Sequence, residues 1–121
     1  MNRILIVDDE ASIRLLYSQE LVEDGYEVDT AGTIAEALDL LQTKSYAVTL
    51  LDIKLKNESG LDLLQKLVRD RSDMAVILST AFSCYKDDFS AWLADGYVVK
   101  SSDMQELKDE IKRLIEKKRV R

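Results

Sequence analysis

The sequence predicts an α/β fold in which five parallel strands alternate with helices, in the order (βα)5. Three short and nearly continuous apolar runs are typical of strands that are covered by helices on both faces. Between the runs, apolar residues recur three and four positions apart, which predicts helices with one buried face. This alternation favours right-handed crossovers and a sheet enclosed between two layers of helices.

The central strands are predicted over residues 4–7, 47–51 and 75–78, where the apolar runs occur. Two further strands differ from these in pattern. Residues 26–31 alternate between polar and apolar side chains, and the run 97–99 is short and ends at Lys100. Both patterns indicate strands nearer an edge of the sheet.

Four helices follow from apolar spacing, and a fifth is predicted near residues 87–94. Thr33 and Asp103 are suitable N-cap residues for the second and the last helix. The last helix carries acidic residues early and Lys117, Lys118 and Arg119 late, which suits the helix dipole. The predicted inward-facing residues are Ile13, Leu16, Tyr17, Leu21; Ile34, Ala37, Leu38, Leu41; Leu61, Leu64, Leu67, Val68; and Met104, Leu107, Ile111, Leu114, Ile115.

The composition indicates one domain spanning residues 1–121, with 17 basic and 23 acidic residues and a net charge of −6. This charge disfavours direct binding to nucleic acid or to anionic lipid. The absence of histidine excludes a phosphohistidine of the protein's own and a histidine metal site. The lone cysteine, Cys84, excludes an internal disulfide bond, and no apolar run approaches a membrane span. Because a strand begins directly after the first residues, we expect no signal peptide and a cytoplasmic protein.

Polar residues stand where the predicted strands end: Asp8 and Asp9 after the first, Asp52 after the third, Thr80 at the fourth and Lys100 at the fifth. Ligands of such sheets bind beyond the carboxyl ends of the strands, so these side chains are expected to converge. Three crowded carboxylates favour a hard cation such as magnesium. If they do crowd, Asp52→Asn should stabilise the metal-free protein and weaken magnesium binding.

Asp52 is the best-placed nucleophile, because carboxylates can accept a phosphoryl group as an aspartyl phosphate. Thr80 could then hydrogen-bond a phosphoryl oxygen, with Lys100 compensating its charge. Each residue alone also has a simpler interpretation. Asp8 or Asp9 could cap a helix, Asp52 could begin a loop, and Thr80 and Lys100 could be an ordinary strand residue and a solvated strand end.

Taken together, the chain resembles the receiver domain of two-component response regulators over essentially its whole length. The resemblance implies a flavodoxin-like fold with the strand order 2-1-3-4-5, an order given for this family and not worked out from the sequence. The matching segments are Ile4-Leu5-Ile6-Val7-Asp8-Asp9-Glu10, Leu50-Leu51-Asp52, Ser59-Gly60-Leu61, Ile77-Leu78-Ser79-Thr80-Ala81 and Gly96-Tyr97-Val98-Val99-Lys100.

The resemblance also implies a role for each site residue. Asp52 would take a phosphoryl group from a histidine kinase or a histidine phosphotransfer protein, and Thr80 and Lys100 would contact it. Tyr97 resembles the aromatic switch residue that turns inward as Thr80 moves. The implied ligands of Mg²⁺, or of Mn²⁺ in its place, are Asp8, Asp9, Asp52 and the backbone carbonyl of Lys54.

Three features depart from the family pattern. Ser101 follows Lys100 where proline in a cis peptide is usual, and a cis bond before another residue is costly, which favours a trans peptide. Residues 53–58 lack a proline-glycine turn, which favours a more mobile loop. Lys54 and Phe82 occupy positions that flank the path of the hydrolytic water in the family, which predicts a slowly decaying phosphoryl group.

The favoured function is a phosphorylation switch that controls a protein target or a covalently linked output domain, as a monomer or a phosphorylation-linked dimer. Such a switch assists only its own phosphorylation and dephosphorylation and is not an enzyme in the usual sense. An aspartate-nucleophile phosphohydrolase would need a second acid where Lys54 stands. A phosphate-independent interaction module stays open as the alternative. Phe82, Tyr85, Phe89, Trp92 and Tyr97 could form a switching contact surface, but their spacing favours a helix face packed on the sheet.

Overall fold

The computed structural model describes residues 2–52, 54–55, 58–70, 74–80, 94–100 and 104–119, which include a five-stranded parallel sheet. The strand order is β2-β1-β3-β6-β7, which confirms the order 2-1-3-4-5 and the two predicted edge strands. The bounds are β1 (Arg3–Val7), β2 (Glu27–Ala31), β3 (Val48–Asp52), β6 (Ala75–Thr80) and β7 (Gly96–Val99).

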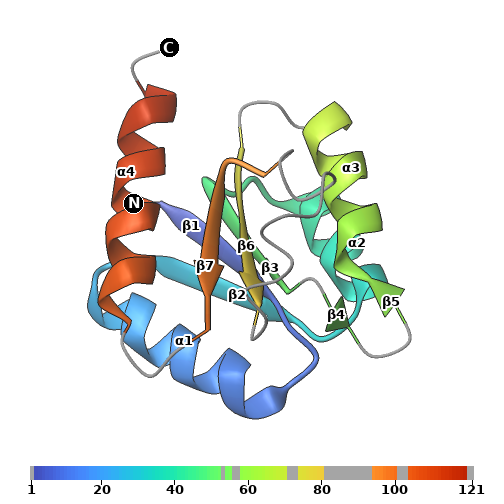
Figure 1. Cartoon of the computed structure of the whole chain (residues 1–121), viewed down its shortest axis with the longest axis horizontal. Helices are drawn as coiled ribbons and strands as arrows, with labels where there is room; N and C mark the ends of the chain where they lie inside the picture. Colours follow the sequence, from blue (N-terminus) through green and yellow to red (C-terminus); the bar gives the residue numbers. More distant parts are fainter. Residues whose placement is uncertain are drawn as a thin grey trace.

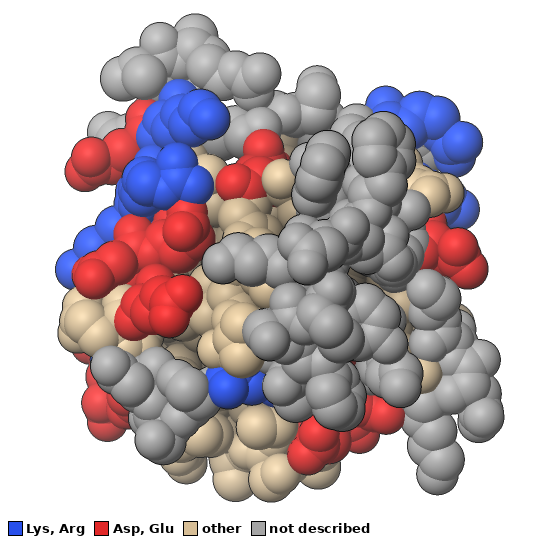
Figure 2. All heavy atoms as spheres, viewed as in Figure 1, with Lys and Arg blue, Asp and Glu red and all other residues tan. Residues whose placement is uncertain are grey.

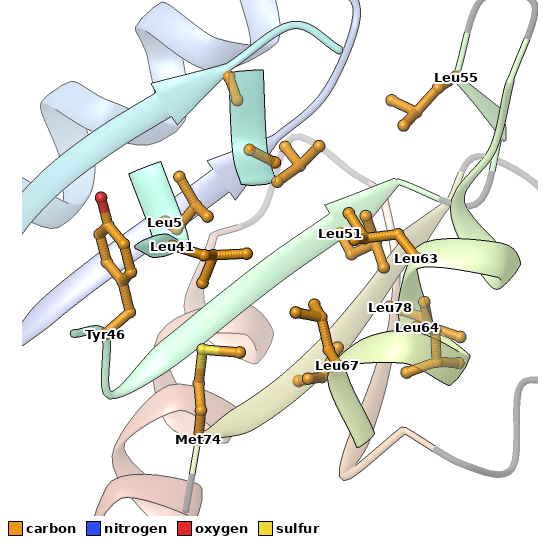
Figure 3. Close-up of a cluster of buried hydrophobic side chains, with 14 residues drawn as sticks. Leu5, Leu41, Tyr46, Leu51, Leu55, Leu63, Leu64, Leu67, Met74 and Leu78 are labelled. Carbon is orange, nitrogen blue, oxygen red and sulfur yellow. The ribbon is translucent and has the colours of Figure 1, made fainter. Parts of the chain in front are cut away.

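Helices cover both faces of this sheet (Figure 1). One face packs against α1 (Ala11–Glu23) and α4 (Gln105–Arg119), and the other against α2 (Ile34–Thr43) and α3 (Gly60–Asp70). Alternate residues of each strand divide between the two layers: Ile4 and Ile6 join the α1–α4 cluster, whereas Leu5 and Val7 join the α2–α3 cluster shown in Figure 3. The double burial explains why the central strands read as continuous apolar runs.

The prediction for the first helix was wrong at one position. Tyr17 and Leu21 are buried and Ile13 is half-buried, but Leu16 is 44% exposed. Successive helical residues are rotated by about 100°, so a face centred on Tyr17 includes the positions four residues away and excludes its neighbour. Leu15 and Val22 are exposed as well.

The second and last helices follow the sequence pattern closely. The Thr33 hydroxyl accepts a hydrogen bond from the Glu36 N–H at 3.2 Å, which confirms the predicted N-cap, whereas Asp103 lies outside the described residues. All five apolar residues predicted for the last helix are buried, from Met104 to Ile115. Figure 2 shows mostly acidic side chains over the N-terminal half of α4 and basic ones toward its C-terminal end, as the helix dipole favours.

One segment differs from the sequence-based prediction, and another lies almost wholly outside the described residues. After Asp52 the chain forms a short antiparallel pair, β4 (Lys54–Leu55) and β5 (Glu58–Ser59), where a loop was expected. Leu55 is buried in the α2–α3 cluster, and this burial ties the pair to the body of the protein. Of the helix predicted near residues 87–94, only Ala94 is described, and it lies in a bend.

The end of α1 determines how the chain returns to the sheet. The Gly25 N–H donates to the Val22 carbonyl and the Tyr26 N–H to the Leu21 carbonyl, at 3.0 and 3.2 Å. This is the Schellman arrangement, which needs a left-handed residue, and Gly25 has a φ of 94°. Glycine is therefore required here by the turn itself.

A polar cluster on the far side of the sheet from α1 should make folding sensitive to acid. Asp29 Oδ2 accepts hydrogen bonds from the Tyr46 hydroxyl at 2.7 Å and from Lys44 Nζ at 3.2 Å. Burial alone would raise the pKa of Asp29, but these bonds lower it below its ordinary value of 3.8. Since the pKa is lower in the folded state, the stabilisation is present above about pH 4 and is lost as the pH falls further.

Asp29→Asn is therefore expected to cost about 1–2 kcal/mol at pH 7, the contribution of a hydrogen bond to a charged group. The difference from the parent should shrink toward zero near pH 2, where the parent carboxylate is itself protonated. Urea unfolding at several pH values measures this difference. Glu27→Gln is the control, because the Arg3–Glu27 pair is exposed and should contribute little. A cost of Asp29→Asn that does not change with pH would contradict the assignment.

Candidate functional site

Two aspartates lie side by side at the carboxyl ends of neighbouring central strands. Val7 pairs with Leu51 in the parallel ladder, so the next residues, Asp8 and Asp52, are adjacent at the strand ends. Both are buried, with exposed fractions of 3% and 5%. By strand alternation they belong to the sheet face that α1 and α4 cover. The structure thus confirms that these carboxylates converge.

Lys100 joins the two carboxylates. Its Nζ lies 2.7 Å from Asp8 Oδ2 and 3.3 Å from Asp52 Oδ2. Burial would lower the pKa of Lys100, but the two aspartates more than offset this and raise it, so the side chain is an ammonium group at neutral pH. Lys100 itself therefore supplies part of the positive charge that balances the crowded carboxylates.

A cluster of acidic oxygens opens from this pair toward the surface. One carboxylate oxygen from each of Asp8, Asp9 and Glu10 lies within 4.8 Å of the others. The Glu10 N–H also donates to Asp8 Oδ1 at 2.9 Å, which fixes the orientation of that carboxylate. A set of hard oxygen ligands with one exposed side is what Mg²⁺ prefers, because this ion usually keeps several waters. The donor set therefore fits the ion that the resemblance implies.

The backbone of Asp8 is held on both sides. Its N–H donates to the Ala31 carbonyl at 3.0 Å, and its own carbonyl accepts a hydrogen bond from Arg14 Nη1 at 2.7 Å. Arg14 packs closely on Gly32, since a Cβ there would lie 3.0 Å from Nη1. These contacts fix the start of the acidic segment between β1 and α1.

Two site residues were not recognised from the sequence. Tyr17 was predicted only as a core residue, and Ser79 only as part of a strand end. In the structure both are buried on the α1–α4 side of the sheet, and Ser79 is the register partner of Asp52 in the parallel ladder. The available signal was a tyrosine at the centre of an apolar helix face, because a buried phenol hydroxyl usually needs a polar partner.

The other predicted residues are not brought into this cluster by the described part of the chain. Tyr97 is half-buried and packs against the α2–α3 cluster, on the opposite face of the sheet from Asp52. Thr80 ends β6 and Lys54 begins β4, but the side chains of both lie outside the described residues. Phe82, Cys84, Ser101 and the aromatic residues Tyr85, Phe89 and Trp92 lie outside them as well.

Comparison with known proteins agrees with the family resemblance of the sequence. The family model described as response regulator receiver domain matches residues 4–112. A crystal structure of the response regulator TrrA from Thermotoga maritima in complex with Mg²⁺ and BeF has 46% sequence identity and a TM-score of 0.90, over 94% of this chain and 99% of that one. TrrA in complex with the histidine kinase ThkA matches with a TM-score of 0.88, at 46% identity over 94% of this chain and 98% of that one.

The curated relatives are longer proteins. The probable transcriptional regulator ycf27 of Cyanophora paradoxa is 36% identical over 93% of this chain, which spans 48% of that protein. The alginate biosynthesis transcriptional regulatory protein AlgB of Pseudomonas putida is 36% identical over 88% of this chain, which spans 24% of it. The chain thus spans half or less of the length of these two relatives. Within the described residues, no helix has the length and apolar character to cross a membrane.

Proposed function

Since this chain belongs to the family of response regulator receiver domains, we propose that it works as a phosphorylation switch with Asp52 as the phosphoacceptor. The observation that supports this most strongly is the contact of Lys100 with both Asp8 and Asp52 at the strand ends. A buried carboxylate with an ammonium group beside it can act as a nucleophile while the charge of the incoming group is balanced. The same contact disfavours a phosphate-independent module.

In the proposed reaction, an Asp52 carboxylate oxygen forms a bond to phosphorus while the bond from phosphorus to the donor's imidazole nitrogen breaks. Such transfers depend mainly on positioning and on charge neutralisation. When the phosphoryl group is attached to Asp52, Lys100 would shift toward it and donate a hydrogen bond to one phosphoryl oxygen. We propose for two further residues the roles that the family resemblance implies. Thr80 would be a second hydrogen-bond donor to the phosphoryl group, and Tyr97 would be the switch residue.

The proposed cation is Mg²⁺, with Mn²⁺ as a substitute, held by Asp8, Asp9, Asp52 and the backbone carbonyl of Lys54. When bound, it would neutralise the phosphoryl oxygens as a Lewis acid. The acidic cluster around Asp8 supports this site, and TrrA provides a relative that was crystallised with Mg²⁺ and BeF. Lys54 and Phe82 would slow hydrolysis by blocking the approach of water.

The proposed partner is a histidine kinase or a histidine phosphotransfer protein, since the relative TrrA forms a complex with the kinase ThkA. The exposed apolar residues of α1, Leu15, Leu16 and Val22, offer such a partner an apolar contact surface. The output would be a protein target or a linked domain, as in the longer relatives named as transcriptional regulators. We propose that the domain acts in the cytoplasm as a monomer or a phosphorylation-linked dimer, without binding nucleic acid or membrane itself, and turns over no external substrate.

The test is phosphorylation by acetyl phosphate in magnesium, followed by intact mass. A single phosphoryl adduct is expected on the parent protein and none on Asp52→Ala. Asp62→Ala, which removes an exposed carboxylate from α3, is the matched control and should be modified like the parent. An adduct that survives in Asp52→Ala would place the phosphoacceptor elsewhere. No adduct on the parent, with magnesium bound, would favour the phosphate-independent module.

A further inference from the structure

Arg14 contacts the backbone of the acidic segment and has no part in the function proposed above. It lies in the first turn of α1, and its Nη1 donates a hydrogen bond of 2.7 Å to the carbonyl of Asp8. A positive charge is unfavourable at the N-terminus of a helix, and it also repels a bound Mg²⁺. Any benefit of Arg14 to the cation-bound protein must therefore come from its contacts and not from its charge.

The Asp8 carbonyl belongs to the peptide group that precedes Asp9. A peptide group is planar, so the hydrogen bond from Arg14 fixes the orientation of the whole plane. The next peptide group, between Asp9 and Glu10, is held as well, because the Glu10 N–H donates to Asp8 Oδ1 at 2.9 Å. With both flanking planes held, the backbone angles of Asp9 are fixed, and so is the direction in which its side chain leaves the backbone.

A fixed Asp9 matters for the binding of a cation. One of its carboxylate oxygens lies within 4.8 Å of one from Asp8 and one from Glu10. Carboxylates this close repel one another and would turn apart if the backbone allowed it. A backbone that holds them together in advance reduces the cost of ordering them when the cation binds. The affinity for the cation therefore depends on the peptide plane that Arg14 holds.

Gly32 leaves the room that the Arg14 side chain occupies. A Cβ at this position would lie 3.0 Å from Nη1 and 3.4 Å from Cζ of Arg14. Gly32 directly follows Ala31, whose carbonyl accepts a hydrogen bond from the Asp8 N–H at 3.0 Å. The end of β2 thus supports Asp8 directly, through its backbone, and indirectly, through the place it gives to Arg14. Among the described glycines only Gly25 has a positive φ, so alanine at Gly32 would act through this contact and not through backbone strain.

We propose that Arg14 is a positioning residue for the cation site, and that Gly32 is needed to admit its guanidinium group. In this role Arg14 touches neither the cation nor the phosphodonor, because it acts through the peptide group between Asp8 and Asp9. The inference rests on the proposed function for the identity of the cation, but it does not depend on phosphorylation of Asp52.

Arg14→Met should weaken magnesium binding about fivefold, a fold-change within reach of one hydrogen bond made by a charged group. The direction is informative. If Arg14 acted only through its charge, the same substitution would tighten the binding of a cation. Calorimetric titration with magnesium, without a phosphodonor, measures the affinity. Arg3→Met is the matched control, because it removes an arginine that pairs with Glu27 at the other end of β1, and it should leave the affinity unchanged.

Gly32→Ala tests the same contact from the other side. The new methyl group should displace the guanidinium from the Asp8 carbonyl and weaken magnesium binding about threefold. In the Arg14→Met background it should have no further effect, because the flexible methionine gives way and holds no carbonyl. Urea unfolding in EDTA establishes that each variant is folded before the titration. The alanine variant keeps the inference testable even if Arg14→Met does not fold.

Phosphorylation by acetyl phosphate separates cation positioning from donor binding. At saturating magnesium, Arg14→Met should reach a maximal rate within about twofold of the parent, with an unchanged half-saturating concentration of acetyl phosphate. At magnesium concentrations well below the dissociation constant, its rate should fall about fivefold, in line with the weaker cation affinity.

A magnesium affinity of Arg14→Met equal to or above that of the parent would overturn the inference. A rise in the half-saturating concentration of acetyl phosphate would do so too, because Arg14 would then act on the donor. An equal loss from Gly32→Ala in both backgrounds would refute the role given to Gly32. A parent protein that binds magnesium but takes no phosphoryl group would contradict the proposed function instead, and the magnesium affinities would still decide the role of Arg14.

Discussion

Replacing Lys100 with methionine is expected to lower the free energy of unfolding of the metal-free protein by about 3–5 kcal/mol, as found when one partner of a buried ion pair is removed. The Lys100 ammonium lies 2.7 and 3.3 Å from the carboxylates of Asp8 and Asp52. Methionine keeps the apolar stem, so little packing is lost. The two buried carboxylates would then face each other without a compensating charge, and their repulsion would destabilise the fold.

Magnesium should reverse much of this loss. A cation that binds only the folded state at 100 times its dissociation constant stabilises by about 2.7 kcal/mol. Urea unfolding in EDTA and in magnesium therefore measures the effect, and Lys100→Met should gain more from magnesium than the parent does. Lys108→Met is the matched control, because Lys108 also contacts two carboxylates, Glu20 and Asp24, but between helix surfaces away from the site. If both lysine variants lost the same small amount, the site ion pair would not be a determinant of stability.

Much of this fold follows from local pattern. The central strands are recognisable because burial on both faces leaves few polar positions, as in Ile4 to Val7. The strand ends are recognisable because a polar residue stops each run, and the parallel arrangement then brings Asp8, Asp52 and Lys100 to one edge. These inferences need only periodicity and the order of the elements. The strand order itself came from the family resemblance.

The errors arise where the structure depends on contacts between distant segments. Leu16 was expected to be buried, but the burial of Tyr17 fixes the rotation of α1 and leaves Leu16 in solvent. The β4–β5 pair has strands of two residues, too short to show any period, and Leu55 secures it through the core. Ser79 lies beside Asp52 only because β6 pairs with β3, and no local pattern could have named it.

The electrostatics of the site were also only partly predictable. Crowding of the carboxylates follows from the strand ends alone, and it led to the expectation that Asp52→Asn stabilises the metal-free protein. The sequence could not show that Lys100 contacts both aspartates, or that it lies closer to Asp8 than to Asp52. This asymmetry changes what the two aspartates are expected to do when each is replaced by its amide.

Asp8→Asn and Asp52→Asn should shift stability in opposite directions in the absence of magnesium. Both oxygens of Asp8 have a partner: Oδ1 accepts a hydrogen bond from the Glu10 N–H at 2.9 Å, and Oδ2 forms an ion pair with Lys100 Nζ at 2.7 Å. An asparagine has one acceptor oxygen, so its amide group must face one of these donors. We expect Asp8→Asn to cost about 2–4 kcal/mol, the range for an unsatisfied buried group next to a charge.

At position 52, an asparagine can present its carbonyl oxygen to Lys100, and it removes one of two carboxylates that share a single ammonium group. Asp52→Asn should therefore stabilise the metal-free protein by up to about 1 kcal/mol, the relief of the remaining repulsion. Both variants should gain less from magnesium than the parent gains, because each removes a proposed ligand. Urea unfolding of the three proteins, with EDTA and with magnesium, gives all of these quantities. Equal losses in EDTA would mean that Lys100 stabilises the two carboxylates alike, and the difference between its two contact distances would then have no energetic consequence.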